Sequence, residues 1–212
     1  MKYVGIGLQC TPTSAFDQAG VREYAYPFDW MFCPGKTSYI IMKICLEEGI
    51  ENAIEYMITG YKYYILRRKE RYTLMEKPTN RQMNPVTGVG IVHNAVNDDF
   101  KATLKRRFER LLIDIRSGVN MTFVYADTAS YAIQYHLDGI DFGVDVTEYL
   151  IKLHVLLSAY NPNIKIKYFC HSERMCGKDN NVIEHIGFTS RKRWEIVAGV
   201  IAEHIKLNHL IV

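Results

Sequence analysis

The clearest repeat of apolar residues along the chain lies between positions 98 and 116. Asp98 and Asp99 supply a cap and a favourable negative charge where a helix would begin. Gly118 follows its far end, where a C-terminal glycine is expected. The pattern predicts an amphipathic helix whose apolar stripe, repeating every 3.6 residues or about one turn, consists of Phe100, Leu104, Phe108, Leu111, Leu112 and Ile115.

Short apolar runs alternate with longer helical stretches over the rest of the chain. Strands are predicted for the runs at 3–7, 88–93, 121–126 and 164–169. Helices are predicted after residue 10, within 37–66, and over 145–160 and 194–207. This alternation favours one α/β domain over residues 1–212, with a mainly parallel sheet flanked by helices. A helical insertion followed by a polar loop (67–87) is expected within about 37–87.

The composition is that of an ordinary globular protein, and it excludes several classes. The 212 residues are 48% hydrophobic and 23% charged, with 14 glycines and 6 prolines, which excludes a fibrous or low-complexity chain. No apolar run approaches the roughly 18 residues of a membrane span, and the first residues do not resemble a signal peptide. We therefore expect a cytoplasmic protein with no membrane partner. Because the net charge is only +3, we expect no nucleic-acid partner either.

Chemically reactive side chains follow the ends of the predicted strands. Cys10 comes after the first strand, His93 ends the second, Asp127 follows the third and His171 follows the fourth. In an open parallel sheet, ligands bind beyond the carboxyl ends of the strands, so these side chains are candidates for one shared site. Cys10 also precedes a predicted helix, whose free N–H groups and dipole favour a thiolate and a lowered thiol pKa.

A thiolate, an imidazole base and a carboxylate that orients the imidazole form the usual nucleophilic arrangement. Cys10, His93 and Asp127 are therefore the candidate catalytic residues. Each has a structural alternative, namely a buried packing thiol, a satisfied structural histidine and a cap for residues 128–130. Zinc is a further interpretation, with Cys170, His171 and Cys176 as added ligands. The chain has no CxxC pair and no tight histidine spacing, so we expect no metal and no cofactor.

Four segments carry a resemblance to a known family. They are VGIGLQC at 4–10, YAYPFDW at 24–30, GIVHN at 90–94 and RRFER at 106–110, the last one preceding the strand segment GVNMTFVYAD. Over about residues 3–170 the chain resembles the family of papain-like cysteine peptidases found in bacteria and large DNA viruses. The resemblance implies a cysteine peptidase in which Cys10 is the nucleophile and His93 the base.

The chain departs from that family at two points. Relatives often carry His-Asp where this chain has His93-Asn94, so an orienting acid is missing at that position. A papain-like domain begins its core with the helix that bears the cysteine, whereas a predicted strand precedes Cys10 here.

Five further residues are candidates for contact with a substrate: Asp29, Trp30, Arg107, Arg110 and His171. Asp29 and Trp30 either line the mouth of the site or anchor local packing, with the carboxylate bonded to backbone or to an arginine. The arginines either pair with Asp29 or bind a phosphate or carboxylate, which suits the guanidinium fork.

Three functions of different classes follow from these patterns. The first is a cysteine-dependent hydrolase or acyl transferase with a Cys-His-Asp site at the carboxyl edge of the sheet. The second is a nucleotide-sugar-dependent glycosyltransferase that holds a phosphate at the turn between Gly5 and Cys10. The third is a non-catalytic interaction module. For either enzyme the expected partner is a small-molecule, peptide or glycan substrate.

Overall fold

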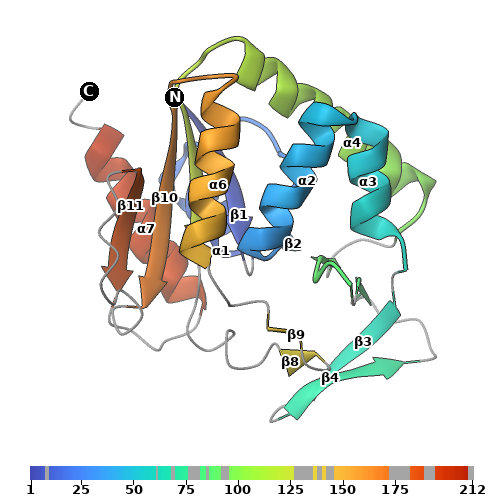
Figure 1. Cartoon of the computed structure of the whole chain (residues 1–212). Helices are drawn as coiled ribbons and strands as arrows, with labels where there is room; N and C mark the ends of the chain where they lie inside the picture. Colours follow the sequence, from blue (N-terminus) through green and yellow to red (C-terminus); the bar gives the residue numbers. More distant parts are fainter. Residues whose placement is uncertain are drawn as a thin grey trace.

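Four parallel strands form the central sheet of the computed structural model (Figure 1). The structure describes residues 1–7, 10–60, 62–67, 70–75, 82–84, 86–91, 96–126, 136–137, 140–141, 146–171, 182–188 and 194–209. In their order across the sheet, the four strands are β1 (Lys2–Gly7), β7 (Met121–Ala126), β10 (Ile164–His171) and β11 (Ile183–Phe188). The predicted strands at 3–7, 121–126 and 164–169 are therefore confirmed, whereas β11 is an addition.

Alternate residues of these strands belong to two different hydrophobic cores. Val4 and Ile6 of β1 pack in the larger core, as do Phe123 and Tyr125 of β7. The intervening Tyr3 and Val124 pack in the smaller core, together with Ala126 and Phe169. A period of two with apolar residues on both sides is what a strand covered on both faces requires.

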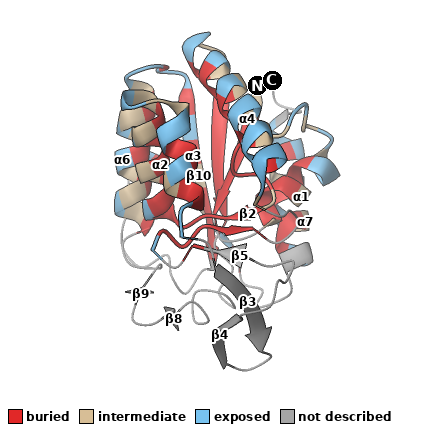
Figure 2. Ribbon diagram, turned by 90° about the vertical axis from the view of Figure 1, so that its right-hand side faces the viewer, coloured by how far each residue is buried: buried red, intermediate tan, exposed pale blue. Residues whose placement is uncertain are grey.

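Helices cover both faces of the sheet (Figure 2). On the face of the smaller core lie α1 (Thr11–Ala19) and α7 (Trp194–His209). The larger core is completed by α2 (Gly35–Glu47), α3 (Ile50–Ile58), α4 (Asp98–Arg116) and α6 (Val146–Ser158). This confirms the α/β class with a mainly parallel sheet between helices. Within the described ranges, no helix is both long and apolar enough to cross a membrane.

Helix α4 spans the residues that its apolar stripe predicts, and all six residues of that stripe are buried. Its N-cap is Asn97, one residue before the predicted aspartate. The Asn97 side chain accepts a 2.9 Å hydrogen bond from the backbone N–H of Phe100. Asp98 and Asp99 lie in the first turn, where negative charge is favourable.

A second, antiparallel sheet runs in the order β2-β6-β5-β3-β4. Its members are β2 (Met31–Phe32), β6 (Gly90–Ile91), β5 (Gln82–Met83), β3 (Lys62–Arg67) and β4 (Glu70–Met75). The run predicted as the second strand of the parallel sheet is β6, which pairs antiparallel with β2 and β5 instead. That part of the prediction was wrong because an apolar run reveals a strand but not its partners.

The stretch predicted as helix up to residue 66 and as loop from 67 contains a hairpin. Helix α3 ends at Ile58, and β3 and β4 then pair antiparallel. Both strands, KYYILR and ERYTLM, are rich in tyrosine, isoleucine or threonine, which favour pleated strands. The helical spacing that precedes Gly60 does not continue through them. A smaller pair consists of β8 (His136–Leu137) and β9 (Ile140–Asp141).

Candidate functional site

Cys10 stands where the first strand turns into the first helix. It occupies the N-cap position of α1, three residues after β1 ends at Gly7. Its carbonyl oxygen accepts the backbone N–H of Ser14 at 2.9 Å, which closes the first turn of the helix. The residue is partly exposed. Cys10 therefore lies beyond the carboxyl end of β1, on the edge where the sequence predicts a site.

The thiol of Cys10 is nevertheless not ionised by its helix. Burial raises the pKa of this thiol to about 11, against a smaller opposing effect of a backbone hydrogen bond. The sequence predicts a lowered value, because a helix N-terminus favours negative charge. Here the loss of solvation is the larger effect. Nucleophilic use of Cys10 therefore requires a base that removes the thiol proton.

Three segments of chain meet at the end of β1. Gly7 pairs in register with Ala126, the last residue of β7. The carbonyl oxygen of Gly7 also accepts the backbone N–H of Cys33 at 2.7 Å, in an isolated antiparallel bridge. Cys33 directly follows β2, in which Met31 pairs with Ile91 of β6. The edge next to Cys10 is thus bordered by the end of β7 and by the chain after β2, and β6 lies on the other side of β2.

Glycine is required at position 7 for this junction. Its φ of 126° is a conformation that side chains rarely adopt. A Cβ atom there would lie 2.8 Å from the carbonyl oxygen of Ala126 and 3.0 Å from its nitrogen. The absence of a side chain lets β1 and β7 stay in contact up to their last residues.

Two of the three predicted catalytic residues, His93 and Asp127, lie outside the described residues. The described chain stops two residues before His93, at Ile91, and one residue before Asp127, at Ala126. Their contact with Cys10 therefore stays a prediction. His171 is the last residue of β10 and pairs in register with Phe188 of β11.

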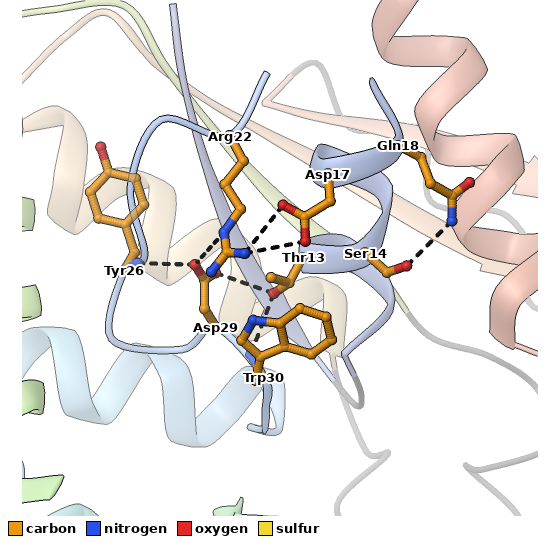
Figure 3. A network of polar contacts seen from close by, with 8 residues as sticks. All are labelled: Thr13, Ser14, Asp17, Gln18, Arg22, Tyr26, Asp29 and Trp30. Atoms are coloured by element: carbon orange, nitrogen blue, oxygen red, sulfur yellow. Dashed lines mark hydrogen bonds and ion pairs between the residues drawn. The ribbon is translucent and has the colours of Figure 1, made fainter. Parts of the chain in front are cut away.

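Asp29 lies beneath α1 at the centre of a polar cluster (Figure 3). Its side chain is only 2% exposed. Oxygen Oδ1 accepts a hydrogen bond from the Thr13 hydroxyl at 3.2 Å, and Oδ2 accepts the backbone N–H of Tyr26 at 3.0 Å. Arg22 forms an ion pair with the same carboxylate, with Nε 3.5 Å from Oδ2. The carboxylate thus faces protein groups, as in the packed-anchor alternative.

Burial dominates the electrostatics of Asp29. It raises the pKa of the carboxyl to about 6, although the hydrogen bond from Tyr26 and the charges of Arg22 and Arg107 act in the opposite direction. Arg107 of α4 is half-buried, and its own pKa is lowered by burial while Asp29 opposes that change. The charge of Arg107 therefore lowers the pKa of Asp29, whereas the ion pair with this carboxylate is formed by Arg22. A pairing of Asp29 with an arginine of RRFER stays a prediction.

Trp30 and Arg110 complete the set of predicted contact residues. Trp30 is the only non-glycine residue with a positive φ, 62°, in the described part of the chain. Its backbone N–H points to the Thr13 hydroxyl at 3.4 Å, and its ring faces the Arg22 guanidinium at 5.7 Å. Arg110 donates to the carbonyl oxygen of Ala25 at 2.9 Å and stacks over the Tyr24 ring at 4.7 Å. A role of either residue in substrate contact stays a prediction.

The sequence does not reveal Thr13 and Arg22 as members of this cluster. The family-like motif PFDW singles out Asp29 and Trp30, but no periodicity links positions 13, 22 and 29. Hydrogen bonds between a helix and a loop depend on how the loop returns to the sheet. Among the residues with described positions, no group of three His, Cys, Asp or Glu side chains is placed to hold a metal ion.

A protein-family model described as "Putative papain-like cysteine peptidase" matches residues 1–138, well over half of the chain. The chain belongs to this family. In this cysteine peptidase-like chain the matched region contains Cys10, Asp29, His93 and Asp127, but not His171. The matched region also ends before α6, β10, β11 and α7. No curated protein and no solved structure matches the sequence.

Proposed function

We propose that the protein is a cysteine-dependent hydrolase or acyl transferase in which Cys10 is the nucleophile, His93 the base and Asp127 the group that orients the imidazole. One observation carries this proposal. Cys10 begins α1 at the end of β1, where Gly7 contacts both the last residue of β7 and the residue after β2. The family to which the chain belongs adds independent support.

The register of the strands supports the choice of His93 and Asp127. Asp127 follows Ala126, the partner of Gly7, and His93 comes two residues after Ile91, the partner of Met31. Because adjacent Cα atoms are about 3.8 Å apart, Asp127 is tethered one peptide unit from the partner of Gly7, and His93 is tethered two peptide units from the end of β6. A thiol with a pKa raised by burial needs such a base.

The proposed reaction proceeds in two steps. Cys10 Sγ forms a bond to a carbonyl carbon of the substrate while His93 takes the thiol proton, and N–H groups in the first turn of α1 stabilise the oxyanion. His93 passes the proton to the leaving amine or alcohol as its bond to that carbon breaks. Water, or an acceptor nucleophile in a transferase, then attacks the resulting thioester. This releases a carboxylic acid or the transferred acyl product and restores the thiol.

The experiment is the pH dependence of iodoacetamide alkylation at Cys10, followed by peptide mass spectrometry. Burial alone raises the pKa of the Cys10 thiol, so only a base that takes the thiol proton would allow alkylation well below pH 8, and this is what we expect in the wild type. Alkylation of Cys10 should be much faster than at the buried Cys33 or Cys45, because burial raises the pKa of both thiols to about 12. In His93→Ala, which lacks the proposed base, alkylation of Cys10 should be slower and should require a higher pH than in the wild type.

His154→Ala is the matched control, because it also removes an imidazole, but from a different helix. His154 lies on α6, and its ring is hydrogen-bonded to the carbonyl oxygen of Ile164 in β10. Its alkylation profile should match that of the wild type. If Cys10 reacts as slowly as the buried thiols, or if His93→Ala leaves its profile unchanged, the Cys-His mechanism is wrong.

The glycosyltransferase alternative predicts a different experimental result. It assigns Cys10 a structural role and predicts that nucleotide sugars with Mn²⁺ raise the melting temperature in a thermal-shift screen. A negative screen together with unreactive Cys10 favours the non-catalytic module. A reactive Cys10 that depends on His93 excludes both.

A further inference from the structure

The carboxylate of Asp29 lies close to the strand that leads to Cys10. A Cβ atom placed on Gly5 of β1 would lie 3.5 Å from Oδ1 of Asp29, and 3.0 Å from Cβ of Pro12 in α1. The glycine therefore makes room for both the carboxylate and the first turn of the helix against the strand backbone. Asp29 occupies the space between β1 and α1.

The hydroxyl of Thr13 links the first turn of α1 to the loop that contains Asp29 and Trp30. Thr13 is buried and lies three residues after Cys10. Its hydroxyl donates to Oδ1 of Asp29 at 3.2 Å and accepts the backbone N–H of Trp30 at 3.4 Å. Both hydrogen-bonding directions of the hydroxyl are used, so the rotamer of Thr13 is set by the 26–30 loop and not by solvent.

Arg22 fixes the next turn of the same helix. Its Nη1 atom lies 3.2 Å from both carboxylate oxygens of Asp17, while its Nε atom lies 3.5 Å from Asp29. Thr13 and Asp17 are four residues apart and therefore share one face of α1. Asp29 holds this face at two successive turns, directly through Thr13 and indirectly through Arg22 (Figure 3).

The backbone of Trp30 adopts a conformation that is unfavourable for a residue with a side chain, and the cluster maintains it. A bulky residue with a φ of 62° lies in the left-handed region, which side chains rarely occupy. In this conformation the Trp30 N–H points to the Thr13 hydroxyl, and the chain continues into β2. The residue after β2, Cys33, then donates its N–H to the carbonyl oxygen of Gly7. The cluster thus connects α1, the loop and β2 at the edge where Cys10 lies.

We propose that Asp29 is a positioning residue: through Thr13 and Arg22 it sets the first turn of α1 and thereby directs the Cys10 thiol towards the edge formed by the end of β7 and the chain after β2. This proposal rests on the proposed function, in which Cys10 is the nucleophile. Asp29 itself touches no reacting atom, because its carboxylate is buried among protein groups.

The test compares Thr13→Val, Thr13→Ser and Asp29→Ala in the full chain, by the rate of Cys10 alkylation with iodoacetamide at pH 7. Small displacements of a reacting group lower rates steeply, so Thr13→Val and Asp29→Ala should react at least about tenfold more slowly than the wild type. Thr13→Ser keeps the hydroxyl and should restore a rate within about twofold of the wild type. Circular dichroism establishes that each variant is folded.

Ile115→Val is the matched control for a general loss of stability, because Ile115 is buried in the larger core and is not one of the residues bonded to Asp29. It should lower the melting temperature without slowing alkylation. A folded Thr13→Val with the wild-type rate overturns the proposal, and so does equal slowing in Ile115→Val. The two proposals fail separately. An unchanged profile in His93→Ala overturns the Cys-His mechanism and the positioning role that rests on it, whereas an unchanged rate in Thr13→Val, with a profile that still depends on His93, overturns only the positioning role.

Discussion

At the scale of single residues, burial and charge act against each other at both Cys10 and Asp29. A helix N-terminus stabilises a nearby negative charge by roughly 0.3–1 kcal/mol at an exposed position. At Cys10 the loss of solvation exceeds that contribution, and the pKa of the thiol rises to about 11. At Asp29 the same effect exceeds the combined influence of two arginines and two hydrogen bonds. Both groups are therefore protonated at a higher pH than in a free peptide.

The raised pKa of Asp29 predicts a specific dependence of stability on pH. Between pH 3.8, the ordinary pKa of the carboxyl, and its folded pKa of about 6, the folded state binds this proton more tightly than the unfolded state. The free energy of unfolding should therefore fall as pH rises through this window. The loss should reach about 3 kcal/mol above pH 6, since one pKa unit corresponds to roughly 1.4 kcal/mol. Below pH 4 this contribution is fully present.

Urea unfolding of the wild type and Asp29→Asn at a series of pH values measures this contribution. The amide cannot ionise, so the stability of Asp29→Asn relative to the wild type should rise as pH increases from 4 to about 7. Asp98→Asn removes a fully exposed carboxylate from the first turn of α4 and controls for the loss of one charge. Parallel pH curves for the wild type and Asp29→Asn would contradict the assignment.

At the scale of secondary-structure elements, the end of β1 decides where Cys10 lies. The strand is in contact with β7 through its last residue and with the chain after β2 through the same residue, Gly7. Helix α1 then begins within a few residues. The short connection leaves little freedom in the placement of Cys10 relative to the sheet edge.

Gly7→Ala should therefore destabilise the protein more than Gly20→Ala. Both glycines have a positive φ, but only at Gly7 would the added Cβ meet backbone atoms, whereas nothing lies within 4 Å at Gly20. The conformational cost of an alanine at Gly20 is about 1–2 kcal/mol. The clash with Ala126 should add about 1–3 kcal/mol at Gly7. Thermal and urea unfolding compare the two variants, and equal losses of stability would contradict the role of Gly7.

At the scale of the whole molecule, the sheet depends on residues beyond those that match the family model. The match ends at residue 138, yet β7 lies between β1 and β10, and β10 in turn pairs with β11. Helices α6 and α7 also come from the later residues, and each covers a different core. The matched region thus supplies two of the four described parallel strands.

A chain shortened to residues 1–138 should consequently not fold cooperatively. It would expose the backbone edge of β7 and would remove α6 and α7 from the two cores to which Phe123 and Val124 belong. We expect a broad, non-cooperative thermal transition and aggregation, against a single transition for the full chain. Circular dichroism and size-exclusion chromatography make the comparison. A soluble fragment with a sharp transition would show that the later strands are dispensable.

The sequence by itself determined the elements whose patterns are local. Periods of 3.6 and 2 within about twenty residues identify the apolar stripe of α4 and the strand runs of β1, β7 and β10. The turn residues around Cys10 are equally local. These local patterns were sufficient to predict an α/β class, helices on both sides of a parallel sheet and a cysteine beyond the end of the first strand.

Only the tertiary structure decided which elements are neighbours. It moved Gly90–Ile91 from the parallel sheet to an antiparallel one, formed a hairpin from the end of a predicted helix and the start of a predicted loop, and added β11. It also joined Thr13, Arg22 and Asp29 and set the solvation of Cys10. These features depend on contacts between distant parts of the chain, for which a local pattern of apolar and polar residues contains no signal.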